Sequence, residues 1–296
     1  SPRTQIYRAR KQNDGTAVVL KILRPEAASS ENLARFRQEY KIISGMNADG
    51  IITSRALEKF ENSLMIVTEE INGISLNKLP TEKIRTMKHF LPIAVRLAGI
   101  LENIHKHHVI HKDINPSNII QNPETGQIQV IDFGISTELP RENVGLQIPD
   151  VLEGTLAYMS PEQTGRMNRS VDFRTDFYSL GATFYKLLTG KPPFDLDDPL
   201  EMVHCHLAKN PLAPNLINPE IPIPISKIVM KLMAKNAEDR YQSAYGLKAD
   251  LEDCLSRYPG KLSDFVIGEH DISDRFRIPQ KLYGREQEIE KLLSAF

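Results

Sequence analysis

Two short segments of the chain carry side chains that suit phosphoryl-transfer chemistry. In the segment 109–120, Asp113 stands five residues before Asn118, between apolar flanks. Asp132 opens an Asp-Phe-Gly tripeptide nineteen residues after Asp113. Phosphoryl transfer requires a cation on the nucleotide phosphates, metal ligands, a group that orients the attacking hydroxyl, and a rigid frame. The sequence offers a candidate for each of these four parts.

The first 70 residues predict a small lobe of short strands around one helix. Residues 17–23 are rich in β-branched and apolar side chains, and the Asn-Asp-Gly sequence at 13–15 is a hairpin turn signal. Apolar residues then recur at helical spacing over 30–45, with a glycine as the stop. Residues 64–68 predict another buried strand.

The rest of the chain predicts a larger helical lobe. An apolar stripe from Leu91 to Ile104 predicts one long helix, with Pro92 near its first turn. Proline-rich joints separate the further helices. These are predicted over 175–189, 199–209, 225–235 and 243–257. The expected fold class is therefore α+β, with a small β-rich lobe before a larger helical one.

Composition excludes several classes of protein. Of the 296 residues, 41% are hydrophobic and 25% charged, which is the balance of an ordinary globular protein. A net charge of −1 provides no field that would attract nucleic acid or an anionic membrane. Charged residues interrupt the most apolar stretch, so no membrane span is expected. Two distant cysteines, Cys205 and Cys254, predict neither a disulfide framework nor a zinc site and favour the cytoplasm.

The two segments of the opening observation resemble the protein kinase superfamily. Residues 109–120 are similar to its catalytic loop, and Asp132 begins its Asp-Phe-Gly motif. The resemblance implies that Asp113 accepts or orients the proton of a substrate hydroxyl. It also implies that Asn118 and Asp132 ligate Mg²⁺, as hard oxygen ligands for a hard cation, and that ATP is the phosphoryl donor. The expected partners are protein substrates.

Other family positions occur in the family order. Lys21 looks like the strand lysine that contacts the α- and β-phosphates, and Glu39 looks like its helix partner. The frame of the site is expected to come from residues outside the chemistry. These structural residues are His111, Glu162, Asp176 and Arg240, with a Glu162–Arg240 ion pair and with Asp176 holding the catalytic loop.

The linker between the lobes can be aligned in the same way. Residues 67–73 resemble the segment whose backbone binds adenine, which makes Glu69 and Ile71 candidate nucleotide-binding residues. Thr68 falls at the gatekeeper position, where a small residue leaves a back pocket open. Ser75 is expected near the ribose.

The resemblance also predicts the domain boundaries. The kinase domain is expected over 1–258, with the first strand of the family fold missing. Its parts are an N-lobe at 1–70, a hinge at 68–75 and a C-lobe at 76–258.

A different resemblance begins after the predicted kinase domain. Residues 259–281 are expected to be a linker, and 282–296 resemble the opening helix of an AAA-type P-loop ATPase. Together with the catalytic loop, this tail resembles a bacterial family that joins a Ser/Thr kinase domain to an AAA-type ATPase, a GAF sensor and a histidine kinase. The downstream domains of such a polypeptide are therefore expected partners.

Two departures from the family pattern leave an alternative open. Thr4 and Ser1 stand at the last two glycine positions of a loop that is normally glycine-rich. Asn115 replaces a lysine two residues after Asp113. Loss of that positive charge predicts a slower enzyme. The alternative is a pseudokinase that serves as a nucleotide-binding or regulatory module. Retention of Lys21, Glu39, both metal ligands and the base opposes it.

Histidines permit a further interpretation. His105, His107, His108 and His111 crowd together, but three of them lie at a predicted helix end, so a metal site is not expected. His204 and His206 are expected to line a surface helix.

Overall fold

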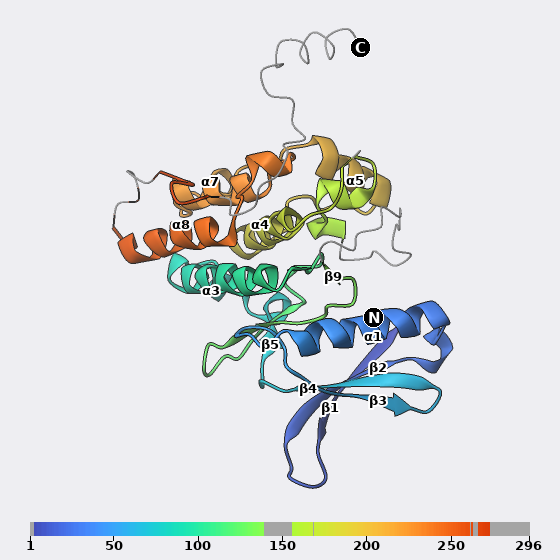
Figure 1. Cartoon of the computed structure of the whole chain (residues 1–296). Helices are drawn as coiled ribbons and strands as arrows, with labels where there is room; N and C mark the ends of the chain where they lie inside the picture. The colour runs from blue at the N-terminus through green and yellow to red at the C-terminus, as the bar shows by residue number, and fades with distance from the viewer. Residues whose placement is uncertain (1–2, 139–155, 168, 261, 263–265, 273–296) are drawn as a thin grey trace.

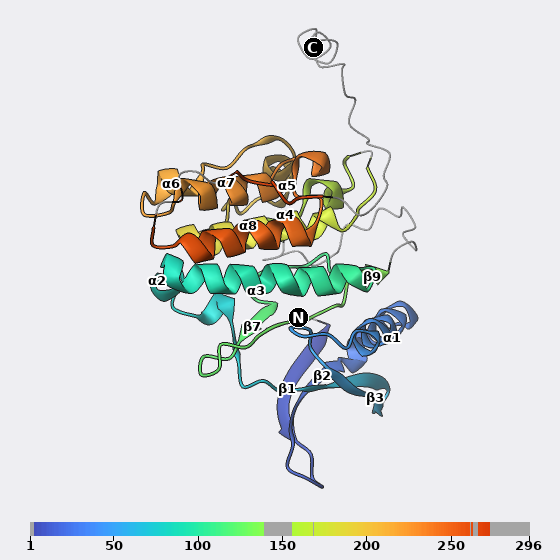
Figure 2. The ribbon, with the colours of Figure 1, turned by 60° about the vertical axis from the view of Figure 1, so that its left-hand side comes forward.

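The computed structural model describes residues 3–138, 156–167, 169–260, 262 and 266–272, and it confirms a two-lobed α+β architecture (Figures 1 and 2). The small lobe is a four-stranded antiparallel sheet with one long helix. The sheet order is β1-β2-β4-β3. Its elements are β1 (Thr4–Arg10), β2 (Ala17–Leu23), α1 (Ser30–Gly45), β3 (Ser54–Phe60) and β4 (Ser63–Glu69).

The predicted hairpin turn joins β1 to β2. Gly15 has a φ of +69°, a left-handed conformation that glycine adopts without a steric cost. Asp14 Oδ1 accepts a hydrogen bond from the Thr16 backbone N–H at 2.9 Å, which closes the turn. The turn places Lys21 opposite Ile6 in the β1–β2 register and opposite Ile66 in the β2–β4 register. Lys21 is thereby fixed in the middle of the sheet.

Helix α1 begins where the sequence predicted. Ser29 caps it by accepting a hydrogen bond from the Asn32 backbone N–H at 3.2 Å. The helix packs on β3 and β4 through a small core that includes Phe36, Leu64 and Ile66. Because Glu39 lies one turn beyond Phe36, this packing turns Glu39 toward the interior.

The connection between the lobes follows β4 directly. Thr68 and Glu69 still belong to β4, whereas Ile74 and Ser75 form β5 and pair with β7 of the large lobe. Only 70–73 lie between these strands. Arg8 of β1 stabilises this segment, because its guanidinium pairs with Glu70 at 2.8 Å and donates to the Gly73 carbonyl at 3.1 Å.

The large lobe is helical, with short strands near the boundary between the lobes. Its strands are β5 (Ile74–Ser75), β6 (Val109–Ile110), β7 (Ile119–Gln121), β8 (Ile128–Val130) and β9 (Thr137–Glu138). Its helices are α2 (Thr81–Ile84), α3 (Met87–Lys106), α4 (Arg174–Thr189), α5 (Pro199–Ala208), α6 (Pro214–Ile217), α7 (Ile223–Leu232) and α8 (Ala244–Arg257). None of the described helices is long and apolar enough to cross a bilayer.

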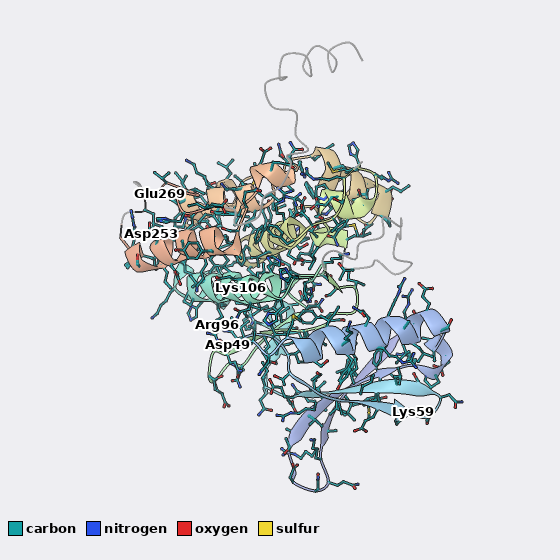
Figure 3. The ribbon with its side chains drawn as sticks, viewed as in Figure 1. Asp49, Lys59, Arg96, Lys106, Asp253 and Glu269 are labelled. Atoms are coloured by element: carbon teal, nitrogen blue, oxygen red, sulfur yellow. The ribbon has the colours of Figure 1, made fainter. Side chains whose placement is uncertain are left out.

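Helix α3 runs along the face of the large lobe that is turned to the small lobe (Figure 1). Its predicted stripe is buried, and it packs against α8. One detail of the sequence prediction is wrong, because α3 begins at Met87 and Pro92 therefore lies in its second turn. Arg96 of α3 pairs with Asp49 of the small lobe at 2.8 Å, and Figure 3 shows both side chains at this junction.

The surface prediction for the two α5 histidines is wrong for one of them. His204 is exposed, but His206 is only 1% exposed and bonds to Tyr178 of the buried helix α4. Residues two apart on a helix point about 200° apart, so they cannot share one face. His206 therefore packs in the core of the lobe, and His204 faces solvent.

Part of the predicted linker packs on the large lobe. Leu262 belongs to the main hydrophobic core, and Ile267 packs against it. The Asp271 carboxylate accepts hydrogen bonds from the backbone N–H groups of Gln242 and Ser243 at 2.9 Å each, directly before α8. This segment, residues 266–272, is called the docked segment below.

Candidate active site

Lys21 joins the two lobes through a pair of carboxylates. Its Nζ lies 2.6 Å from Oε1 of Glu39 on α1 and 2.8 Å from Oδ1 of Asp132, which follows β8. The sheet, the helix and the Asp-Phe-Gly segment therefore meet at one ammonium group. Glu39 is buried, whereas the Asp132 side chain is 42% exposed.

The charges in this group favour the ionised pair. Burial acts to lower the pKa of Lys21, but the carboxylates of Asp132 and Glu39 outweigh it and raise that pKa. Partial burial acts to raise the pKa of Asp132, but the Lys21 ammonium outweighs it and lowers that pKa. Burial also raises the pKa of Glu39, so the charge of this buried carboxylate depends on Lys21.

Asp113 lies between two amide side chains. Asn115 Nδ2 donates to its Oδ1 at 2.8 Å, and Asn118 Nδ2 donates to its Oδ2 at 2.8 Å. Burial and the neighbouring negative charge of Asp132 raise the pKa of Asp113 to about 7. The side chain predicted to receive a substrate proton is thus held at both oxygens.

The backbone of the catalytic loop is anchored by Asp176 of α4. Its carboxylate is fully buried and accepts from the His111 N–H at 3.0 Å and from the Lys112 N–H at 2.7 Å. Lys112 has a φ of +68°, a strained conformation for a non-glycine residue. The two hydrogen bonds hold this strain in place. His105 Nε2 adds a third contact to Asp176 at 2.8 Å.

His111 connects the loop to the Asp-Phe-Gly segment. Its Nδ1 accepts from the Asp113 N–H at 3.2 Å, and its Nε2 donates to the Ile131 carbonyl at 3.2 Å. The ring packs edge-on against Phe133, with centroids 4.6 Å apart. Burial lowers the pKa of His111, which agrees with a neutral ring that both accepts and donates.

Glu162 and Arg240 form the predicted ion pair deep in the large lobe. The guanidinium reaches the two carboxylate oxygens at 2.6 and 2.8 Å. Thr175 of α4 donates to the same carboxylate at 2.7 Å. Burial acts to raise the pKa of Glu162, but Arg240 outweighs it and lowers that pKa. The pair ties the segment before α4 to the one before α8.

The linker candidates lie near the site but engage it differently. Thr68 is buried, and its hydroxyl donates to the Val19 carbonyl at 3.4 Å. The Glu69 side chain accepts from Gln129 of β8 at 2.9 Å. The Ile71 carbonyl already accepts from Asn122 at 2.7 Å, and Ser75 is held in β5. The side chains of Thr68 and Glu69 and the Ile71 carbonyl are therefore already engaged, and the other groups of this segment are the candidates for nucleotide contacts.

The donor set fits a divalent cation beside a nucleotide. The backbone N–H of Ile131 donates to the Asn118 carbonyl at 2.9 Å, which ties the two ligand segments together. Among the described residues, Asp132 Oδ2 and Asn118 Oδ1 have no hydrogen bond, so both oxygens are available as hard ligands. No group of three or more His, Cys, Asp or Glu side chains in the described part of the chain could hold a metal ion, and this includes the four crowded histidines.

Gly134 lies close beside these groups. A Cβ built on it would lie 3.1 Å from Asp132 Oδ1, 3.6 Å from Glu39 Oε2 and 3.9 Å from Lys21 Nζ. A larger residue would press on the carboxylate that pairs with Lys21. A side chain at Gly134 would therefore require a small shift of the Asp132 carboxylate.

Sequence reasoning missed three polar residues that position the site. Asn115 was read only as the loss of a charge, and His105 only as part of a histidine-rich helix end. Gln163 donates to the Lys112 carbonyl at 2.8 Å and was not singled out. A signal existed for His105, because it lies four residues after Leu101 of the apolar stripe, on the face that packs inward. No sequence pattern predicts the contact of Gln163 with the Lys112 carbonyl.

Parts of the sequence prediction fall outside the described residues. Thr4 begins β1 at the edge of the sheet, but Ser1 and 282–296 lie outside the described residues. The segment 139–155, between the Asp-Phe-Gly motif and the predicted end of the activation segment, also lies outside them.

The family model for the protein kinase domain matches residues 3–250. The chain belongs to the protein kinase family. The match includes every residue of the site described above. Protein kinases act on proteins and use ATP, in general with a divalent metal ion, and the geometry of Lys21, Asp113, Asn118 and Asp132 is consistent with that use.

Bacterial kinases are among the similar proteins. The chain is 31% identical over 261 residues to the probable serine/threonine-protein kinase SCO3848 of Streptomyces coelicolor, covering 86% of this chain and 38% of that protein. It is 31% identical over 254 residues to the serine/threonine-protein kinase PknB of Mycobacterium tuberculosis, covering 84% of this chain and 40% of that protein. The chain thus spans about two fifths of the length of these relatives.

A relative of another architecture also matches. The hybrid signal transduction histidine kinase G of Dictyostelium discoideum is 31% identical over 295 residues, which cover 69% of this chain and 8% of that protein.

Proposed function

We propose that this chain is the Ser/Thr kinase domain of a bacterial signalling protein and transfers the γ-phosphoryl group of ATP to a protein hydroxyl. The observation that carries the proposal is the contact of Lys21 with Asp132 at 2.8 Å, across the two lobes. It puts a cation and a metal-ligand candidate side by side, next to the segment that holds Asp113. The similarity to two bacterial serine/threonine-protein kinases supports a Ser or Thr hydroxyl as the phosphoryl acceptor.

Each residue of the site has one task in this proposal. The Lys21 ammonium, held by Glu39, neutralises phosphate charge on the nucleotide. Asp132 and Asn118 hold Mg²⁺ through the oxygens that remain free. Bound Mg²⁺ supplies neutralisation of the charge that develops on the phosphate oxygens. The backbone of Glu69 and Ile71 contacts the adenine, and Ser75 lies near the ribose.

Asp113 acts on the protein substrate. Each of its oxygens accepts one amide hydrogen bond and keeps a further lone pair. Asp113 therefore aligns a Ser or Thr hydroxyl and accepts its proton as the new phosphate ester forms. The backbone bonds from His111 and Lys112 to Asp176 keep this carboxylate in place, so alignment costs little entropy during the reaction.

The alternative is a pseudokinase that binds nucleotide without transferring phosphate. Thr4 favours it, because a β-strand residue with a side chain stands where the family has a glycine. The convergence of Lys21, Asp113, Asn118 and Asp132 favours catalysis, since a regulatory module needs neither a base nor two metal ligands.

Phosphate transfer by the full-length polypeptide tests the proposal. With labelled ATP, Mg²⁺ and a generic basic protein as substrate, Asp113→Ala and Asp132→Ala should each reduce transfer by about 100-fold or more. Asp253→Ala is the matched control, because among the described residues this half-buried carboxylate of α8 pairs with Arg257 at 2.8 Å (Figure 3). Phosphate should appear on Ser or Thr.

Two outcomes would count against transfer by this domain. Equal labelling with the wild type and both variants would end the enzymatic assignment. Nucleotide binding by a wild type that labels no substrate would favour the pseudokinase.

The proposal extends to the polypeptide around the domain. The resemblance of 282–296 to an AAA-type ATPase and the similarity to a hybrid histidine kinase support downstream domains that receive or modulate the kinase signal. Both cysteines are free, and ATP is the donor, which fits a cytoplasmic protein. Its partners are then protein substrates and its own downstream domains rather than nucleic acid or membrane.

A further inference from the structure

The lysine that the family places two residues after the base is replaced here by a residue with its own contacts. Asn115 is 5% exposed, and its Nδ2 donates to Asp113 Oδ1 at 2.8 Å. The same nitrogen lies 3.3 Å from the Asp113 carbonyl oxygen. Asn115 therefore contacts both the side chain and the backbone of the residue that carries the chemistry.

The orientation of the Asn115 amide is determined by a second contact. Its Oδ1 accepts a hydrogen bond from the Ser117 backbone N–H at 2.9 Å. If the amide were reversed, its NH₂ group would face that N–H and its oxygen would face the Asp113 carboxylate. Both contacts would then be repulsive, so only one orientation is compatible with the loop.

Asn115 and Asn118 together enclose the Asp113 carboxylate. One amide holds Oδ1 and the other holds Oδ2, each at 2.8 Å. A carboxylate with one bond at each oxygen cannot rotate about its Cβ–Cγ bond without losing both bonds. Hydrogen bonds to an ionised group are among the stronger ones in proteins.

We propose that Asn115 is a positioning residue that fixes the orientation of the Asp113 carboxylate toward the substrate hydroxyl. This inference rests on the proposed kinase function. It replaces the expectation that position 115 is only a missing charge. Because both polar ends of Asn115 are used within its own loop, the residue acts on the base and leaves the nucleotide to Lys21, Asn118 and Asp132.

The inference predicts a separation of two kinetic constants. Asn115→Ala removes the bond to Oδ1 and should lower kcat by about 10- to 100-fold, which is the range for loss of a hydrogen bond to a charged group. KM for ATP should stay within about twofold, since no nucleotide contact is lost. Asn115→Asp keeps the shape but faces Asp113 with a like charge, so its kcat should fall at least as far.

The matched control for Asn115→Asp makes the same change, from an amide to a carboxylate, at an exposed position. Gln127 lies in the turn before β8, and none of the described hydrogen bonds uses its side chain. Gln127→Glu should leave both constants unchanged. Thermal unfolding of each variant shows whether a fall in kcat reflects only a smaller folded fraction.

A measurement without nucleotide separates this inference from the proposed function. In the 296-residue chain labelled with ¹⁵N-asparagine, Asp113→Ala should shift the side-chain amide signals of Asn115 and Asn118. The side-chain signals of the half-buried Asn103, which donates to the Asp49 carbonyl at 3.2 Å, should not move. This readout does not require that the protein transfers phosphate, so an inactive wild type would defeat the proposed function and leave the test of Asn115 intact.

Either of two results would overturn the inference, and a third would reassign Asn115. One is an Asn115→Ala variant that is folded and has the kcat of the wild type. The other is an Asn115 side-chain signal that does not respond to the loss of the Asp113 carboxylate. A fall in kcat that is matched by an equal loss of ATP affinity would also refute it, because it would assign Asn115 to nucleotide binding.

Discussion

At the scale of single residues, the fully buried Arg240 is satisfied by specific partners. All five N–H donors of Arg240 are used, two of them by Glu162 and three by backbone carbonyls. Such a pair is costly to break, because removal of one partner leaves an uncompensated buried charge. The buried His206 is neutral, and protonation would likewise place an uncompensated charge in the interior.

His206 makes the stability of the large lobe depend on pH. Tyr178 donates to its Nδ1 at 2.9 Å, and Lys235 donates to the Tyr178 hydroxyl at 3.4 Å. Burial, together with the charge of Lys235, lowers the pKa of His206 to about 4. In the unfolded chain the pKa is about 6.5, so only the unfolded state takes up a proton between these values. The free energy of unfolding should therefore fall by up to about 3 kcal/mol as the pH decreases from 6.5 to 4.

Denaturant unfolding between pH 7 and pH 4 measures this effect. His206→Gln should remove the His206 part of the pH dependence, whereas His204→Gln should keep it, since His204 is exposed on the same helix. Identical pH profiles for the wild type and the His206 variant would contradict the prediction.

At the scale of elements, α8 is completed by residues that follow it in the chain. Ser243 caps the helix by accepting from the Gly246 N–H at 3.0 Å, and the Asp271 carboxylate accepts from the N–H groups just before the helix. A negative charge at this end of a helix is also favoured by the helix dipole. Gly246 permits the close approach, since a Cβ there would lie 2.5 Å from the Asp271 Cα.

The docked segment should therefore contribute measurably to stability. Asp271→Ala removes a 5% exposed carboxylate and its bonds to the start of α8, and should cost about 1 to 2 kcal/mol, the range for loss of a helix cap. Gly246→Ala should displace the segment and increase hydrogen exchange at Gln242 and Ser243. The control is Glu269→Gln, an exposed residue of the same segment that Figure 3 shows at the surface. Unchanged thermal unfolding of Asp271→Ala would show that the docking is not stabilising.

At the scale of the whole molecule, several contacts join the two lobes around the site, including backbone hydrogen bonds of Val130 with Gly50 and Ile52 at 2.8 and 3.3 Å. Arg96 pairs with Asp49 at the periphery, and the ion pair of Lys21 and Asp132 crosses at the centre. The segment 70–73 connects the two lobes covalently. A ligand bound by both lobes would make contacts only in the folded state. Ligand binding should therefore raise the free energy of unfolding.

A thermal-shift experiment tests this linkage. A non-hydrolysable ATP analogue with Mg²⁺ should raise Tm of the wild type, and EDTA should remove most of that increase. Asp132→Asn should lose the Mg²⁺-dependent part, because it weakens a ligand oxygen and the pair with Lys21. Lys59→Ala on β3 is the control, as Figure 3 shows this lysine at the far edge of the small lobe. An equal Tm increase with and without Mg²⁺ in all variants would exclude a metal role for Asp132.

The sequence by itself determined the main helices, two strands of the small lobe and the order of the site residues. Hydrophobic periodicity depends on neighbours in the chain, so the helix at 30–45 and the strand at 17–23 were predicted with their ends. The ion pair of Lys21 with Glu39 and that of Glu162 with Arg240 were also expected, because their positions follow from motifs of the family.

Only the tertiary structure decided which polar groups meet. The contact of Asn115 with Asp113, the burial of His206 and the docking of Asp271 before α8 each depend on side-chain distances after packing. Two residues that are close in sequence can point to opposite faces, and two that are far apart can share one hydrogen bond. Local sequence carries the propensity of a residue, but its partner is selected by the packed fold as a whole.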